Sequence, residues 1–128
     1  MKTKHILLID DNDIDNFISH HIISKAEIAE RITIKSSAIE ALEFLNELKD
    51  DFEQFPDFIF LDIAMPLMDG FGFLNEAVKF PKIIQNQCFV AMLSSSVNQN
   101  DIERSMQYPF VKKYFNKPLK PDMLKEIN

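Results

Sequence analysis

What the sequence lacks already excludes several classes of protein. A single cysteine, Cys88, cannot form an internal disulfide, and its place in an apolar run over 88–93 indicates a buried thiol. Basic residues number 14 against 20 acidic ones, which argues against a nucleic-acid surface. The apolar stretch 6–9 is too short for a secretion signal, and no apolar run is long enough to cross a membrane. We therefore expect a cytoplasmic protein without nucleic-acid or membrane partners, which binds proteins or small molecules.

The length and composition predict one domain. The chain has 128 residues, of which 46% are hydrophobic, enough for one well-buried core and too few for a second domain of ordinary size. No internal repeat, low-complexity tract or linker interrupts it. We expect a single domain over residues 1–128.

Two kinds of apolar pattern alternate along the chain and predict an α/β fold. Short apolar runs predict strands at 6–9, 58–61 and 87–93. Alternation of Ile32 and Ile34 with polar residues predicts a half-exposed strand at 31–35, at or near a sheet edge, and a fifth, short strand is expected at 110–115. Apolar residues at helical spacing predict helices at about 14–27, 38–49, 71–80, 99–107 and 121–127. Asp13 is the expected N-cap of the first helix, and Ser37 with Glu40 forms a capping-box pattern before the second. Five strands alternating with five helices predict a parallel sheet with helices on both faces.

Charged and hydroxyl side chains follow four of the five predicted strands. Asp10 and Asp11 come after the first strand, Asp62 after the third, Ser94 after the fourth and Lys117 after the fifth. Because the carboxyl ends of parallel strands meet at one edge of a sheet, and ligands bind there in open α/β folds, we expect these side chains to converge.

The residue types at this edge favour a divalent cation and phosphoryl chemistry. If the first and third strands are neighbours, three carboxylates crowd one crevice and need a cation, and their oxygens suit Mg²⁺ or Mn²⁺ better than zinc. The cation and Lys117 would then leave the crevice neutral. An aspartate in such a crevice can act as the nucleophile that accepts a phosphoryl group, with Lys117 and Ser94 contacting the transferred group.

Each of these groups also has an ordinary structural explanation. An Asp-Asp pair before a helix is commonly turn and capping chemistry, Ser94 fits a solvated turn, and Lys117 fits a surface charge. The histidines are assigned to structure: His5, His20 and His21. The functional interpretation depends on the coincidence that four strand ends facing one edge carry compatible groups.

Three segments resemble the motifs of response-regulator receiver domains, and the resemblance covers essentially the whole chain. Residues 8–11, Leu-Ile-Asp-Asp, resemble the acidic pair of that family. Residues 62–70, Asp-Ile-Ala-Met-Pro-Leu-Met-Asp-Gly, resemble its phosphoacceptor loop, and Lys117-Pro118 resembles its lysine and following proline. The resemblance implies a doubly wound, flavodoxin-like parallel sheet of strand order 2-1-3-4-5 with helices on both faces.

The resemblance also implies roles for individual residues. Asp62 would be the phosphoacceptor, Asp10 and Asp11 would hold Mg²⁺ together with Asp62 and the backbone carbonyl of Ala64, and Lys117 would contact the phosphoryl group. The peptide bond between Lys117 and Pro118 is cis in the family.

A switch is implied as well. Ser94 stands where the family has Thr or Ser, and Tyr114 where it has a switching aromatic residue. Phosphorylation would move Ser94 toward the phosphoryl group, turn Tyr114 inward and change which partner the surface prefers. The family takes partner specificity from exposed residues of the first helix, for which we expect Asn16, Ser19 and His20.

The implied function is that of a bacterial stand-alone receiver with no output domain. It would accept a phosphoryl group from a histidine kinase or a histidine phosphotransfer protein and act on a downstream protein target. It would be no dedicated enzyme, although it would catalyse its own phosphorylation and dephosphorylation. The alternatives are a degenerate receiver that binds partners without phosphorylation, a small phosphohydrolase using an aspartyl-phosphate, and a binder of a flavin phosphate. The acidic first loop argues against the flavin phosphate.

Overall fold

The computed structural model describes residues 3–127, which form a five-stranded, fully parallel sheet of order β2-β1-β3-β4-β5. This confirms the expected fold class, with β3 central and β2 and β5 at the edges. The strands are β1 (Thr3–Ile9), β2 (Ala29–Lys35), β3 (Phe58–Leu61), β4 (Phe89–Ser94) and β5 (Val111–Asn116).

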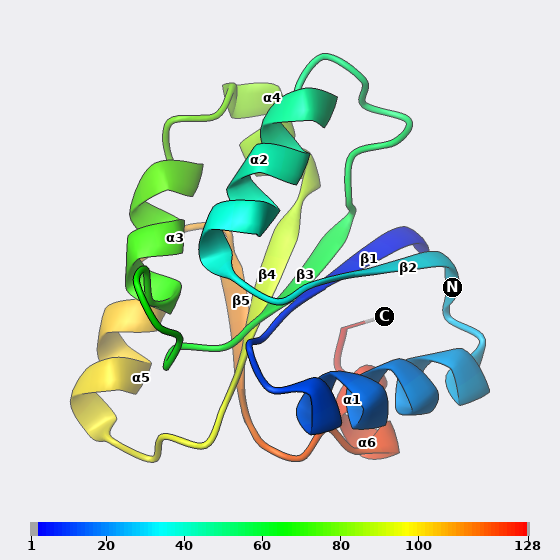
Figure 1. Cartoon of the computed structure of the whole chain (residues 1–128), viewed down its shortest axis with the longest axis vertical. Helices are drawn as coiled ribbons and strands as arrows, with labels where there is room; N and C mark the ends of the chain where they lie inside the picture. The colour runs from blue at the N-terminus through cyan, green and yellow to red at the C-terminus, as the bar shows by residue number, and fades with distance from the viewer. Residues whose placement is uncertain (1–2, 128) are drawn as a thin grey trace.

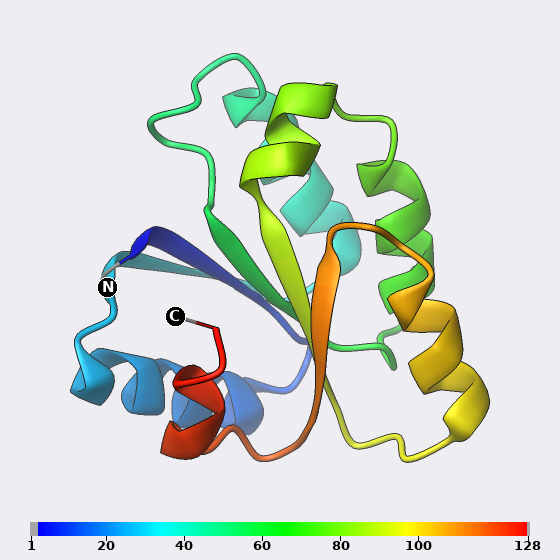
Figure 2. The ribbon, with the colours of Figure 1, turned by 180° about the vertical axis from the view of Figure 1, so that it is seen from behind.

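Helices cover both faces of the sheet, as Figure 1 shows and Figure 2 repeats from behind. One face carries α1 and α6, and the other carries α2, α3 and α5. The helices are α1 (Asp13–Ala26), α2 (Ala38–Leu48), α3 (Gly70–Ala77), α4 (Lys82–Gln87), α5 (Gln99–Met106) and α6 (Pro121–Leu124).

The alternation of side chains along the central strands gives each face its own core. Leu7 and Leu61 belong to a cluster with buried residues of α2, α3 and α4. Leu8 and Phe60 point the other way and join buried residues of α1 and α6. Strands buried on both faces have no polar alternation, which is the pattern that predicted them.

The first helix differs from its prediction in its cap and in its buried face. Its N-cap is Asn12, whose side chain accepts a hydrogen bond from the backbone N–H of Asp15, so the expected cap at Asp13 was wrong by one residue. Ile14 and Phe17 are 70% and 73% exposed, although they belong to the apolar spacing that predicted this helix. The helix instead packs through a smaller, more polar face that includes Asn16, because the strand ends below it offer polar partners.

The chain between β3 and β4 contains two helices, where the sequence predicted one over 71–80. Helix α3 ends at Ala77, and α4 begins after Pro81, which forms its N-cap and cannot continue a helix from the preceding residues. Six helices are thus described instead of five. At the other end, α6 stops at Leu124, three residues short of the predicted end.

Two expectations concern buried groups and membrane spans. Cys88 is buried, as expected, and burial raises the pKa of its thiol, so it stays protonated and unreactive. Within residues 3–127, no helix has the length and apolar character needed to cross a membrane.

His5 gives the fold a predicted dependence on pH. Its ring is buried, with Nδ1 2.8 Å from the Gln54 carbonyl oxygen and Nε2 2.7 Å from the Thr33 hydroxyl. Burial lowers the pKa of His5 below its ordinary value of 6.5, so the folded state binds this proton more weakly than the unfolded state. We expect this contribution to stability to be complete above pH 6.5 and to be lost as the pH falls below it.

The measurement is urea unfolding of the protein and of His5→Gln between about pH 5 and pH 8. The difference in unfolding free energy between the two proteins removes contributions from other titrating groups. It should shrink as the pH falls, since only the parent protein loses stability through this ring. A difference that stays constant with pH would contradict the assignment.

Candidate functional site

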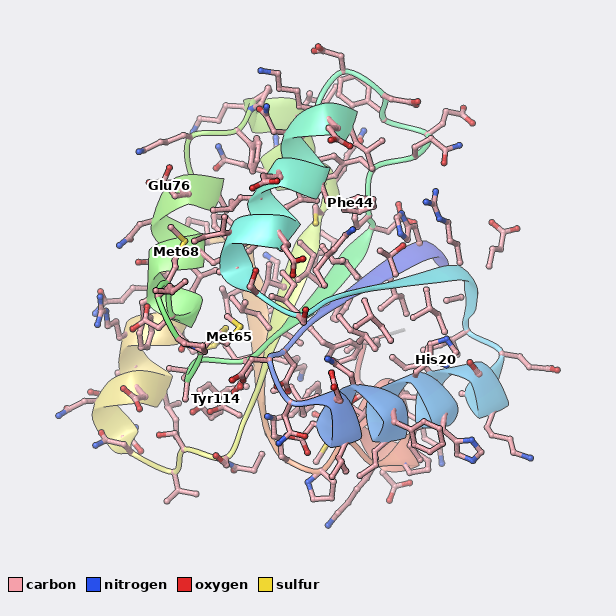
Figure 3. All side chains as sticks on the ribbon, in the orientation of Figure 1. His20, Phe44, Met65, Met68, Glu76 and Tyr114 are labelled. Atoms are coloured by element: carbon pink, nitrogen blue, oxygen red, sulfur yellow. The ribbon has the colours of Figure 1, made fainter. Side chains whose placement is uncertain are left out.

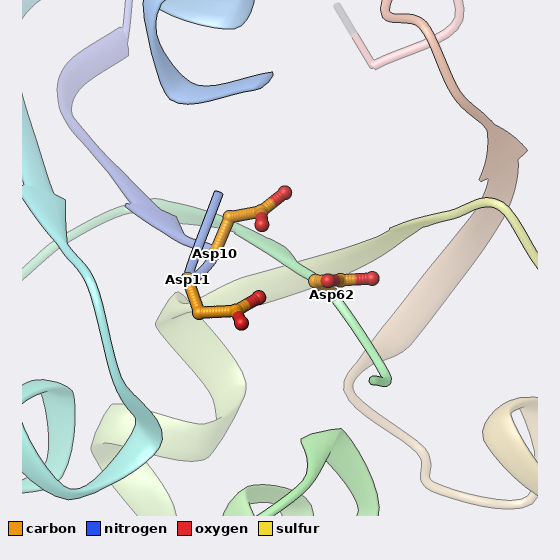
Figure 4. Close-up of side chains that lie close together, drawn as sticks. All are labelled: Asp10, Asp11 and Asp62. Atoms are coloured by element: carbon orange, nitrogen blue, oxygen red, sulfur yellow. The ribbon is translucent and has the colours of Figure 1, made fainter. Parts of the chain in front are cut away.

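Three acidic side chains meet at the carboxyl edge of the sheet. Asp10 follows β1 and Asp62 follows β3, and the backbone N–H of Asp62 donates to the carbonyl oxygen of Ile9, which holds the two strand ends together at 3.0 Å. Asp10 and Asp62 are buried and Asp11 is exposed. One carboxylate oxygen from each lies within 4.8 Å of the other two. Figure 4 shows the three carboxylates side by side.

The surroundings of Asp62 disfavour its charged form. Burial and the neighbouring charge of Asp10 raise the pKa of Asp62 to about 6, and the attraction of Lys117 opposes this only in part. The ionised form of Asp62 is therefore disfavoured where it lies. A divalent cation between the carboxylates would remove this penalty.

Lys117 is the cation that the fold itself provides. Its ammonium nitrogen lies 2.7 Å from a carboxylate oxygen of Asp10, 2.8 Å from one of Asp15 and 3.3 Å from one of Asp62. Burial alone would lower the pKa of Lys117, but these carboxylates outweigh it and raise the pKa, so the side chain stays charged. The backbone N–H of Lys117 donates to the carbonyl oxygen of Ser94, and the following bond to Pro118 is cis, as expected.

Asp15 is a charged residue of the crevice that no pattern in the sequence singled out. It lies in the first turn of α1, where an acidic residue is ordinarily explained by the helix dipole. Its contact with Lys117 gives the crevice a fourth carboxylate. The crevice would consequently keep a net negative charge with a divalent cation bound, and the expected neutral balance was wrong.

Ser94 and Tyr114 lie close to the same loop, which connects β4 to α5. Ser94 is buried at the end of β4, where its hydroxyl oxygen accepts a hydrogen bond from the backbone N–H of Ser96. The half-buried Tyr114 donates its hydroxyl hydrogen to the carbonyl oxygen of Ser96 at 3.0 Å, and Figure 3 shows its ring beside this loop. Asn116 donates to the same carbonyl oxygen. Ser96 therefore joins the two residues that the sequence singled out separately.

The loop after Asp62 contains Ala64, whose backbone carbonyl is the remaining predicted ligand. Asp62 accepts a hydrogen bond from the backbone N–H of Ile63 at 2.9 Å, and the backbone N–H of Gly70 donates to the carbonyl oxygen of Ile63 at 2.8 Å. These bonds fold the start of the loop back against α3. Ala64 follows directly and is exposed.

Two of the three residues expected on the exposed face of the first helix are buried. Asn16 and Ser19 are each 5% exposed, and Asn16 donates its side-chain N–H to the backbone oxygen of Asp10. Asn16 thus supports the acidic loop and offers no partner surface. His20 is exposed, as expected, and Figure 3 labels it on α1.

The donor set fits a hard divalent cation. Among the described residues, the cluster consists of three carboxylates and contains no histidine or cysteine. Oxygen ligands without nitrogen or sulfur suit Mg²⁺ and Mn²⁺ and are a poor match for a structural zinc. Asp10, Asp11 and Asp62 are the side chains that could hold such an ion.

Fold and crevice together define a class of protein. The strand order reverses between β1 and β3, and the acidic residues lie at that switch point, where flavodoxin-like α/β domains bind their ligands. A charged pocket with four carboxylates and one ammonium distinguishes this domain from those that bind an anionic cofactor there.

Comparisons with known proteins identify the family. The model of the response regulator receiver domain matches residues 6–127. The two-component response regulator ORR8 of rice (Oryza sativa subsp. indica) is 32% identical over 122 residues, which span 94% of this chain and 91% of the relative. The chain belongs to the response regulator receiver domain family.

Solved structures agree with this assignment. A two-component response regulator from Cytophaga hutchinsonii superposes with a TM-score of 0.92 at 31% identity, covering 99% of this chain and 95% of that one. The Mn²⁺-bound form of response regulator Rcp1 superposes with a TM-score of 0.75 at 25% identity, covering 97% of this chain and 88% of that one. The predicted family and fold are confirmed.

Proposed function

We propose that this receiver domain accepts a phosphoryl group on Asp62 in a reaction that requires Mg²⁺ or Mn²⁺. The observation that carries the proposal is the cluster of three carboxylates within 4.8 Å, with the Lys117 ammonium within 3.3 Å of Asp62. Such a cluster supplies a nucleophile, a cation site and a fixed positive charge in one crevice. The Mn²⁺-bound Rcp1 structure supports the choice of ion.

Different residues of the crevice would bind the cation and the phosphoryl group. Asp10, Asp11, Asp62 and the backbone carbonyl of Ala64 would hold the cation, which supplies charge neutralisation for the transferred group. Lys117 would contact the phosphoryl oxygens.

The group transfer makes one bond and breaks another. A carboxylate oxygen of Asp62 forms a bond to phosphorus while the bond from phosphorus to the donor's imidazole nitrogen breaks. The nitrogen keeps the electron pair and takes up a proton from water. The reaction needs a phosphohistidine donor, which a histidine kinase or a histidine phosphotransfer protein would present, and no further co-reactant.

Phosphorylation would change the positions of Ser94 and Tyr114. The added charge and phosphoryl oxygens would attract the Ser94 hydroxyl. In the unphosphorylated structure this hydroxyl accepts a hydrogen bond from the backbone N–H of Ser96. Since Tyr114 donates to the carbonyl oxygen of Ser96, movement of this loop would change the position of the tyrosine ring. The altered surface would then bind or release a downstream protein in the cytoplasm.

Intact-mass measurement with acetyl phosphate tests the proposal. With Mg²⁺, the protein should gain one phosphoryl group, about 80 Da, which is labile and absent when EDTA replaces the metal. Asp62→Asn should show no gain, because an amide is not a nucleophile of this kind. If neither acetyl phosphate nor a phosphohistidine protein produces a gain, the domain would instead be a receiver that binds partners without phosphorylation.

A further inference from the structure

Asp15 has a contact with Lys117 that the proposed phosphotransfer does not need. Its carboxylate oxygen lies 2.8 Å from the ammonium nitrogen, shorter than the 3.3 Å between Lys117 and Asp62 itself. The two residues are 102 positions apart in the sequence, so the fold brings them together across the crevice. Asp15 is fixed there by the first turn of α1, where its backbone N–H donates to the Asn12 cap.

Lys117 has a limited number of N–H donors, so its contact with Asp15 limits how many donors can reach a phosphoryl group. An ammonium group has three N–H donors, and three carboxylates, those of Asp10, Asp15 and Asp62, surround it. When Asp62 carries a phosphoryl group, the donor that faced Asp62 can pass to a phosphoryl oxygen. A second donor can follow only if Lys117 leaves Asp10 or Asp15.

Burial decides which carboxylate gives up the lysine. The side chain of Asp10 is 8% exposed, whereas that of Asp15 is 30% exposed. When Lys117 leaves, Asp10 would keep the divalent cation as a partner but gain little water, whereas the partly exposed Asp15 is hydrated by water. Asp15 is therefore the partner that Lys117 can leave at the smaller cost.

We propose that Asp15 is a positioning residue that holds Lys117 in the unphosphorylated protein and releases it when Asp62 is phosphorylated. The inference rests on the proposed function. Asp15 then lowers the rate of phosphorylation, because the ion pair between Asp15 and Lys117 has to break before Lys117 can contact the phosphoryl group fully. The release also carries the charge change at Asp62 to the first turn of α1.

A matched control lies two residues away. Asp13 is exposed in the same helical turn and is not among the three carboxylates that Lys117 contacts. Asp13→Asn and Asp15→Asn each remove one negative charge near the crevice and near the helix N-terminus. A difference between these variants therefore reports the contact with Lys117 and not the general charge.

The experiment measures the rate of phosphorylation by acetyl phosphate and the affinity for beryllofluoride, both at saturating Mg²⁺ and constant ionic strength. Relative to Asp13→Asn, Asp15→Asn should react about fivefold faster and bind beryllofluoride about fivefold more tightly, the lower end of typical coupling between sites. Asp15→Glu, which keeps the carboxylate, should return toward the parent protein. In EDTA, Asp15→Asn should melt below Asp13→Asn, because the metal-free fold loses an ion pair.

The outcomes separate the two proposals. If the parent protein is phosphorylated but Asp15→Asn reacts no faster than Asp13→Asn, the role of Asp15 is overturned while the phosphoacceptor function stands. A slower reaction and weaker beryllofluoride binding in Asp15→Asn would mean that Asp15 only supports the structure. If the parent protein accepts no phosphoryl group from any donor, both proposals fail together.

Discussion

Lys117→Met should lower the rate of phosphorylation by acetyl phosphate by about 100-fold, the usual cost of removing one group that stabilises transition-state charge. The ammonium of Lys117 lies within 3.3 Å of Asp62 and also contacts two further carboxylates. Methionine keeps much of the side-chain volume and removes the charge. The four carboxylates of the crevice then repel the incoming anionic donor, because the variant lacks the one ammonium that contacts them among the described residues.

Two controls separate this effect from a loss of metal. Lys117→Met makes the crevice more negative, so Mg²⁺ should bind more tightly than in the parent protein while phosphorylation slows. Lys120→Met removes the same charge from an exposed residue before α6 and should leave the rate nearly unchanged. A variant at position 117 that reacts at the parent rate would contradict the role given to this lysine.

Gly70→Ala should destabilise the fold and displace Asp62. A Cβ atom at position 70 would lie 2.5 Å from the backbone oxygen of Asp62 and 2.9 Å from the Cα of Ile63, both parts of the backbone that cannot rotate away. Such overpacking typically costs about 1–3 kcal/mol, and urea unfolding would measure it. Because the clash is with Asp62, the rate of phosphorylation should fall as well, even at temperatures where the variant is folded.

Gly72→Ala is the control in the same helix. Its Cβ atom would meet the side chain of Met68 at 2.7 Å, and that flexible side chain can move. Since alanine is favoured over glycine inside a helix by about 1 kcal/mol, this variant should be as stable as the parent protein or more stable. Equal losses of stability at positions 70 and 72 would show that the close approach of α3 to Asp62 is not the cause.

The fold was predictable because the amino-acid composition of its central strands shows that both faces of these strands are buried. The continuous apolar run 58–61 has no polar alternation, and the structure buries it on both faces as β3. The helices were harder to delimit. The predicted third helix ended at residue 80, directly before Pro81, but the short helix α4 that follows this proline has too few apolar residues to be distinguished from a loop.

The site was predictable in outline and not in detail. Strand ends bring Asp10, Asp11 and Asp62 to one edge whatever the side-chain geometry, so counting residues along the chain was sufficient. The contact of Asp15 with Lys117 joins residues 102 positions apart, which no local pattern specifies. The helix turns Asn16, which hydrogen-bonds the backbone of Asp10, toward the sheet and leaves Phe17 exposed, opposite to their polarity.

Chemical reduction of the acyl phosphate tests directly whether Asp62 itself carries the phosphoryl group. Borohydride reduces an acyl phosphate to an alcohol, so treatment of the protein after incubation with acetyl phosphate and Mg²⁺ should convert the acceptor aspartate to homoserine. Peptide mass spectrometry should locate homoserine at position 62 and leave Asp10, Asp11 and Asp15 unchanged. Homoserine at one of those three positions, or a stable phosphoryl group elsewhere with Asp62 intact, would contradict the account.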